Sequence, residues 1–193
     1  MARVQGVKEK LHSPLYDAFL VPGGKLFSDA MGQDKRSIRF FMDVQGKTKL
    51  ETNLQAAGVL PSLNNFEARA LRLVTSSKGV KKDYDTVTED EFLNGLIYNS
   101  VLTLIVGEKV MIEMPTFWFP SGAGVFSHNG SVSHGSPDPM ATFRFAEAVA
   151  IEPQQNFRVE LLFPQGVPEQ TGKTLGELRL WVILDGYLTR DVQ

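Results

Sequence analysis

A chain of 193 residues can form one domain with a substantial core, burying roughly 70% of the surface that the unfolded chain exposes. Its formal net charge is -2, with acidic and basic residues interspersed, which excludes the broad basic footprint of a protein that wraps nucleic acid. Cysteine is absent, which excludes disulfides, thiolate metal ligands and a cysteine nucleophile.

The N-terminal sequence lacks the apolar core of a signal peptide, and no apolar run approaches the ~20 residues that cross a bilayer. We therefore expect no transmembrane segment and synthesis in a cytoplasm. A hydrophobic fraction of 42% beside 22% charged residues is typical of a globular protein.

Residues 1–34 contain frequent turn-forming residues, which predict an irregular or extended N-terminal arm ahead of a folded domain at 35–193. The turn-forming residues are Pro14, Pro22, Gly23, Gly24 and Gly32. The apolar residues of this arm are Leu15, Phe19, Leu20 and Phe27. Packing on the domain's own surface is the favoured interpretation of these side chains, and contact with a neighbouring subunit is the alternative.

Strands are predicted where apolar and polar residues alternate. The predicted strands are Ser37–Val44, 66–73, Val101–Val106, Lys109–Met114, Thr142–Phe145, Phe157–Phe163 and Leu178–Leu184. Gly107 and Glu108 form a two-residue turn between the third and fourth of these. The alternation changes phase at Leu71 and Leu73, which predicts a β-bulge.

One short helix is predicted to begin at Thr88, because Thr88 and Glu91 have the spacing of a capping box. Many short strands with a single brief helix favour an all-β antiparallel architecture, closed or in two sheets, over a parallel α/β fold.

An aromatic segment, Thr116–Phe119, lies between Pro115 and Pro120, which places it at the edge or end of a strand. Strand alternation would put Phe117 and Phe119 on one face and Trp118 on the other. Burial within the chain is the default interpretation, and a subunit interface or a stacking platform for sugar rings are the alternatives.

No constellation of catalytic groups is evident. His128 and His134 lie close in sequence, but they fall in a glycine- and serine-rich loop without an obvious third metal ligand. Ser127, Ser133 and Asp138 do not make a triad by adjacency, and Gly122 and Gly124 lack a full phosphate-binding fingerprint. We assign no catalytic, cofactor-binding or metal-binding residue and expect no enzymatic activity.

Several segments resemble the jelly-roll coat proteins of tailless icosahedral DNA bacteriophages, and the order of these segments carries more weight than any one of them. They are Thr52–Leu54, Ala57–Pro61, Phe66, Val106–Lys109, Pro115, Phe119–Gly124, Ile151–Phe157 and Leu184–Gly186. The resemblance implies one eight-stranded jelly-roll sandwich, because the chain is too short for the two-roll subunit common in such phages.

The resemblance also implies a structural role in a virion: a self-assembling subunit whose oligomeric capsomers form an icosahedral shell with other virion proteins. The residues predicted at subunit interfaces are Leu15, Phe19, Phe27, Phe117, Trp118 and Phe119. Two alternatives remain: a carbohydrate-binding β-sandwich of a spike that uses Trp118 or Tyr187, and a cupin-like metalloenzyme that uses His128 and His134.

Overall fold

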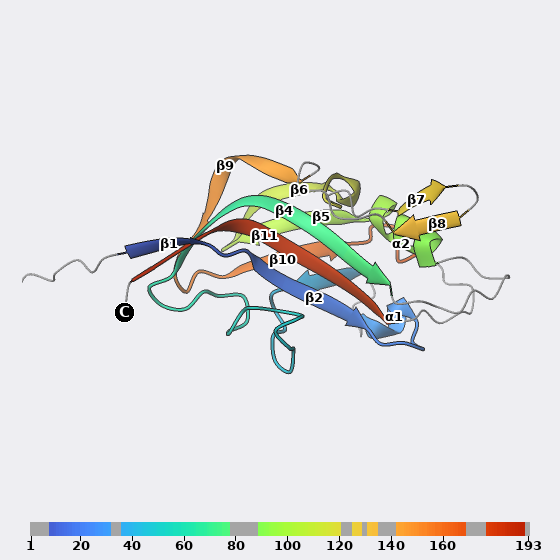
Figure 1. Cartoon of the computed structure of the whole chain (residues 1–193), viewed down its shortest axis with the longest axis horizontal. Coiled ribbons are helices and arrows are strands. Elements are labelled where there is room, and N and C mark those ends of the chain that lie inside the picture. Colours follow the sequence, from blue (N-terminus) through green and yellow to red (C-terminus); the bar gives the residue numbers. More distant parts are fainter. Residues whose placement is uncertain are drawn as a thin grey trace, which may run out of the picture.

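The computed structural model describes residues 8–31, 36–77, 89–120, 125–128, 131–134, 142–168 and 177–191, and the statements below concern these residues. They form two antiparallel β-sheets stacked as a sandwich, and a separate two-stranded hairpin (Figure 1). The predicted all-β sandwich is therefore confirmed.

The first sheet holds five of the described strands. They are β1 (Lys8–His12), β2 (Leu15–Val21), β4 (Asn65–Ser77), β9 (Phe143–Ile151) and β11 (Leu178–Asp191). On one side of β11 lies β4; on the other, β2 pairs with the first half of β11 and β1 with the second half. β9 forms the far edge of this sheet by pairing with β4.

The second sheet holds four of the described strands, in the order β3-β10-β5-β6. They are β3 (Ser37–Phe40), β10 (Phe157–Leu162), β5 (Val101–Val106) and β6 (Lys109–Pro115). β5 and β6 form the predicted hairpin, and Gly107 takes the positive φ, 61°, that its turn requires.

Strand pairing proceeds from the ends of the chain inward. β2 pairs with β11, β3 with β10, β4 with β9, and β5 with β6. A long antiparallel hairpin that pairs in this nested way and then folds over into two sheets is a jelly roll. The single jelly roll expected from the sequence is thus the fold of the described residues.

The core lies between the sheets and follows the alternation of each strand. In β10, Phe157, Val159 and Leu161 are at most 1% exposed, whereas Arg158 and Glu160 alternate with them and form an ion pair. Burial of each such apolar side chain stabilises the fold by about 2 kcal/mol. Since every strand of the two sheets except β1 contributes apolar side chains in this way, the two sheets share one hydrophobic core.

The predicted N-terminal arm needs correction. Residues 8–31 do not form an arm, because β1 and β2 are integral strands of the first sheet and the helical turn α1 (Phe27–Ala30) follows them. Leu15 and Phe27 belong to the core, at 5% and 0% exposure. The favoured interpretation, packing against the chain's own domain, is confirmed for these two side chains.

The longer helix, α2 (Glu89–Tyr98), agrees with the predicted one; Thr88 lies outside the described residues. α2 buries Phe92, Leu93, Leu96 and Ile97 in the core. No helix among the described residues is long and apolar enough to cross a membrane.

Two local predictions need correction. Thr116–Trp118 is a 3-10 turn, η1, that follows the end of β6 and does not continue as an alternating strand. The glycine- and serine-rich region after it contains a hairpin, β7 (Val125–His128) and β8 (Ser131–His134), which lies beside α2 at one end of the molecule (Figure 1).

Candidate functional site

An exposed row of three aromatic rings lies where α2 ends and η1 begins. Tyr98 is 68% exposed, Phe117 47% and Trp118 52%. The ring of Phe117 stacks on Tyr98 with centroids 5.9 Å apart, and on Trp118 with centroids 6.3 Å apart. We call these three residues the aromatic surface.

The exposure of these rings follows from the geometry of η1. A 3-10 helix has about three residues per turn, so Thr116 and Phe119 occupy one side and the two residues between them occupy the other. Thr116 is fully buried and donates its N–H to the carbonyl of Ser100 over 3.0 Å. Phe119 is also fully buried, and Leu73 of β4 donates an N–H to its carbonyl over 2.8 Å. Anchored on both sides, the turn holds Phe117 and Trp118 outward.

A further aromatic side chain, that of Phe143, packs against the aromatic surface. Phe143, at the start of β9, contacts Trp118 with centroids 6.4 Å apart and Phe119 with centroids 5.2 Å apart, both edge to face. Because Phe119 is a core residue, this contact joins the exposed Trp118 to the interior. Trp118 is therefore held in place by packing.

Of the six predicted interface residues, some are buried and others are exposed. Leu15, Phe27 and Phe119 are buried inside the chain, and Phe19 is partly buried with its ring 5.7 Å from that of Phe27. Their packing removes the three buried residues from the candidate interface. Phe117 and Trp118 alone among the six are largely exposed, and Tyr98, which joins them, carried no signal in the sequence beyond its place at the end of a helix.

The two histidines considered for a metal site are not paired by the hairpin that carries them. His128 lies opposite Ser131, and His134 lies opposite Val125. Their backbone positions are therefore three residue steps apart along the ribbon, roughly 10 Å. Within the described part of the chain, no group of three His, Asp or Glu side chains is placed to hold a metal ion.

Tyr187, the other predicted sugar platform, is 37% exposed, and its ring is contacted by three side chains of its own chain. The Nζ of Lys10 lies 5.0 Å and the guanidinium carbon of Arg69 5.5 Å from its ring centroid, and the His12 ring lies 5.6 Å away. Cations over an aromatic face are attracted to it, so a sugar that stacks on Tyr187 would compete with Lys10 and Arg69 for the ring.

The most deeply buried ionisable side chain among the described residues is that of Asp17, on β2. Its carboxylate accepts the N–H of Phe41 over 2.7 Å and the ammonium of Lys47 over 2.9 and 3.0 Å. Burial raises the pKa of Asp17, and the contacts with Phe41 and Lys47 offset part of that rise. Since these groups join β2 to the segment after β3, we interpret the cluster as structural.

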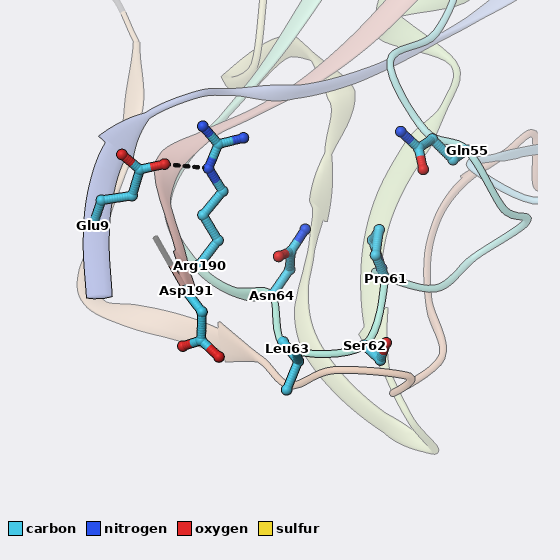
Figure 2. A pocket seen from close by; sticks show the side chains of 8 residues that line it. All are labelled: Glu9, Gln55, Pro61, Ser62, Leu63, Asn64, Arg190 and Asp191. Atoms are coloured by element: carbon cyan, nitrogen blue, oxygen red, sulfur yellow. Dashed lines mark hydrogen bonds and ion pairs between the residues drawn. The ribbon is translucent and has the colours of Figure 1, made fainter. Parts of the chain in front are cut away.

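A hollow of about 550 Å³ lies between the β1–β11 end of the first sheet and the loop before β4. Figure 2 shows the residues that line it: Glu9, Gln55, Pro61, Ser62, Leu63, Asn64, Arg190 and Asp191. None of these residues is predicted from the sequence as part of a binding site. No pattern in the sequence marks the hollow, because its lining residues come from three segments that are far apart in the sequence: β1, the loop before β4, and the end of β11.

No protein family matches the chain, and no curated protein matches it in sequence.

Proposed function

We propose that this chain is a virion structural protein, a coat subunit that assembles with copies of itself, and with other virion proteins, into the icosahedral shell of a tailless DNA bacteriophage. The resemblance described from the sequence motivates this role, and the jelly-roll fold is compatible with it, since the same architecture occurs in viral coats as well as in lectins and cupins. In this proposal no residue has a catalytic role and no cofactor is needed.

The aromatic surface is the observation that carries the proposal. Clustered exposed apolar residues mark contact surfaces, and rigid aromatic rings contribute large contact areas at small entropic cost. Tyr98, Phe117 and Trp118 are exposed together, and Phe143 fixes the last of them. A subunit that meets many copies of itself needs such a preformed contact.

The segments that resemble coat proteins also meet in space. Gly58 accepts a hydrogen bond from Phe157 over 2.8 Å, Gly107 donates one to Asn156 over 2.6 Å, and Gln154 donates one to Leu60 over 3.3 Å. Three segments from separate parts of the chain thus form one end of the sandwich. Their joint packing gives these segments a shared structural role, which is compatible with the resemblance that motivates the proposal.

The net charge of the chain implies that other components would neutralise the packaged DNA. A subunit with a net charge of -2 does not neutralise packaged DNA, so polyamines, inorganic cations, another protein or an internal membrane would have to do so. We accordingly propose no sequence-specific nucleic-acid binding, and localisation of the protein in the virion after synthesis in the host cytoplasm.

The test compares assembly of the wild-type chain with that of a Phe117→Ser, Trp118→Ser double variant, by sedimentation and electron microscopy. We expect wild-type capsomers or particles, and loss of both in the variant with an unchanged circular dichroism spectrum, since both side chains are exposed. Tyr187→Ser is the matched control and should assemble normally. A wild-type chain that stays monomeric at high concentration, with and without other virion proteins, and is absent from particles would refute the proposal.

A second candidate, carbohydrate binding by a spike module, is favoured by one observation. The Trp118 indole is half exposed and held in place, as a stacking platform for a sugar ring must be. Glycan-array binding that Trp118→Ala abolishes, in a chain that does not assemble, would favour this function over the coat protein.

A further inference from the structure

The hollow at the β1–β11 end of the first sheet has the size of a small-molecule site, for which volumes of about 300 to 1,000 Å³ are usual. It lies apart from the aromatic surface: its walls are β1, the end of β11 and the loop at residues 55–64, none of which carries the three aromatic residues. The hollow therefore needs an explanation of its own.

Its polar side chains have few partners within the protein. Among the described residues, the side chains of Gln55, Ser62, Asn64 and Asp191 make no hydrogen bond or ion pair. Arg190 donates from Nε to Glu9, as Figure 2 shows, and its two terminal nitrogens make no further hydrogen bond in the described chain. The hollow thus gathers free amide, hydroxyl, carboxylate and guanidinium groups from three segments.

The balance of these groups narrows the class of ligand. Glu9 and Asp191 against Arg190 leave a formal charge of -1, which disfavours phosphates, nucleotides and other anions. The free nitrogens of Arg190 disfavour a cation in the same place. Among the described lining residues none is aromatic and could stack on a base, and the apolar ones are Pro61 and Leu63.

We propose that this hollow is a binding site for a neutral saccharide. A sugar hydroxyl both donates and accepts hydrogen bonds, so a row of hydroxyls matches the mixture of amides, a carboxylate and a guanidinium that the hollow presents. Pro61 and Leu63 offer the small apolar contact that the C–H faces of a sugar ring require. This site is distinct from the Trp118 platform considered above and does not depend on the coat-protein function.

The binding of one sugar in so open a site is weak, because the hollow leaves much of the ligand in water and its polar groups exchange hydrogen bonds with water for hydrogen bonds with sugar. Many copies on one particle would raise the overall affinity by multivalency. We therefore expect millimolar binding by a single chain and stronger binding by any assembly.

Ligand-observed saturation-transfer NMR tests the proposal with the full chain, since it works for a monomer and for a particle alike. The probes are glucose, galactose, mannose, N-acetylglucosamine and their common disaccharides, each at millimolar concentration. We expect at least one probe to bind. Asn64→Ala and Gln55→Ala, at exposed or partly exposed positions that should not affect folding, each weaken that binding about threefold to tenfold.

Trp118→Ala is the matched control, and binding should be unchanged in it. Absence of saturation transfer to every probe would overturn the proposal, and so would binding that Trp118→Ala abolishes while Asn64→Ala and Gln55→Ala do not alter it. Neither outcome bears on assembly, which is measured separately by sedimentation.

Discussion

Lys47 places its ammonium 2.9 Å from one carboxylate oxygen of Asp17 and 3.0 Å from the other, and the Asp17 side chain is fully buried. The pair joins β2 of the first sheet to the segment that follows β3 of the second. It therefore links the edges of the two sheets by charge as well as by packing.

Removing Lys47 alone should strongly destabilise the protein, because it leaves a buried carboxylate without its counter-charge. For Lys47→Met we expect a loss of about 3 kcal/mol in the free energy of unfolding, measured by urea denaturation. The double variant Asp17→Asn, Lys47→Met should lose less than the sum of the two single variants, since neither charge remains. Lys10→Met, which removes an exposed pair with Glu67, is the control and should lose less than about 1 kcal/mol.

The raised pKa of Asp17 predicts a pH dependence of definite sign. The folded state binds the Asp17 proton more tightly than the unfolded state, so this group's contribution to stability is fully present below its ordinary pKa of 3.8. The contribution is lost as the pH rises from 3.8 through the raised pKa of the folded state. Urea denaturation across acidic pH should show that wild type loses stability relative to Asp17→Asn as the pH rises through this window.

Glu51 provides a control of opposite sign for that experiment. The N–H of Thr48 lowers the pKa of Glu51, so its contribution is present above the ordinary value of 4.5 and is lost as the pH falls through the lowered pKa. Wild type should therefore lose stability relative to Glu51→Gln as the pH falls through the lowered pKa. A difference between wild type and Asp17→Asn that does not vary with pH would contradict the prediction.

Gly186 is required by the close approach of two strands. A Cβ at this position would lie 2.0 Å from the carbonyl oxygen of Glu67 and 2.7 Å from the Phe66 ring, so β11 and β4 would have to separate. We expect Gly186→Ala to cost about 3 kcal/mol or more in thermal or chemical unfolding. Gly95→Ala in α2 is the matched substitution: its Cβ would lie 3.3 Å from the Pro168 side chain, and the gain in helix propensity of about 1 kcal/mol offsets that contact.

Trp118 should report self-association directly. In a Trp181→Phe background, Trp118 is the remaining tryptophan and is 52% exposed. If the aromatic surface is the contact between copies, its fluorescence should shift to shorter wavelength as the protein concentration increases. Trp181, whose indole donates to the carbonyl of Leu50 over 2.9 Å, should show no such shift in a Trp118→Phe background. Identical, concentration-independent spectra in both backgrounds would place the contact elsewhere.

The β-bulge in β4 shows how accurately the local alternation of residues predicts an irregularity in a strand. The sequence predicts it from the phase change at Leu71 and Leu73, and the structure has it at Arg69, which is left unpaired where Ala68 and Ala70 pair with Gly186 and Asp185. Alternation therefore placed the bulge two to four residues too late in β4. β11 accommodates the bulge because Gly186 has no side chain to meet the carbonyl of Glu67. Gly186 lies more than a hundred residues away in the sequence, so the local pattern could not reveal this.

The aromatic segment shows where local reasoning fails. The prolines correctly placed it at the end of a strand, but strand alternation put Phe117 and Phe119 together, whereas the 3-10 turn separates them. The buried hydrogen bonds of Thr116 to Ser100 and of Leu73 to Phe119 select that turn. Both partners lie outside the segment, so its own residues could not reveal which ring is buried.

The alternation of apolar and polar residues and the frequent turn residues determined by themselves that this protein has an all-β antiparallel fold, closed or in two sheets, because burying one face of each strand needs no knowledge of its neighbours. Only the tertiary structure decided that β1 and β2 are part of a sheet, which rings remain exposed, and that a hollow forms beside Asn64 and Arg190. Each of these depends on segments joined by long-range strand pairing, and that pairing is fixed by the fold as a whole.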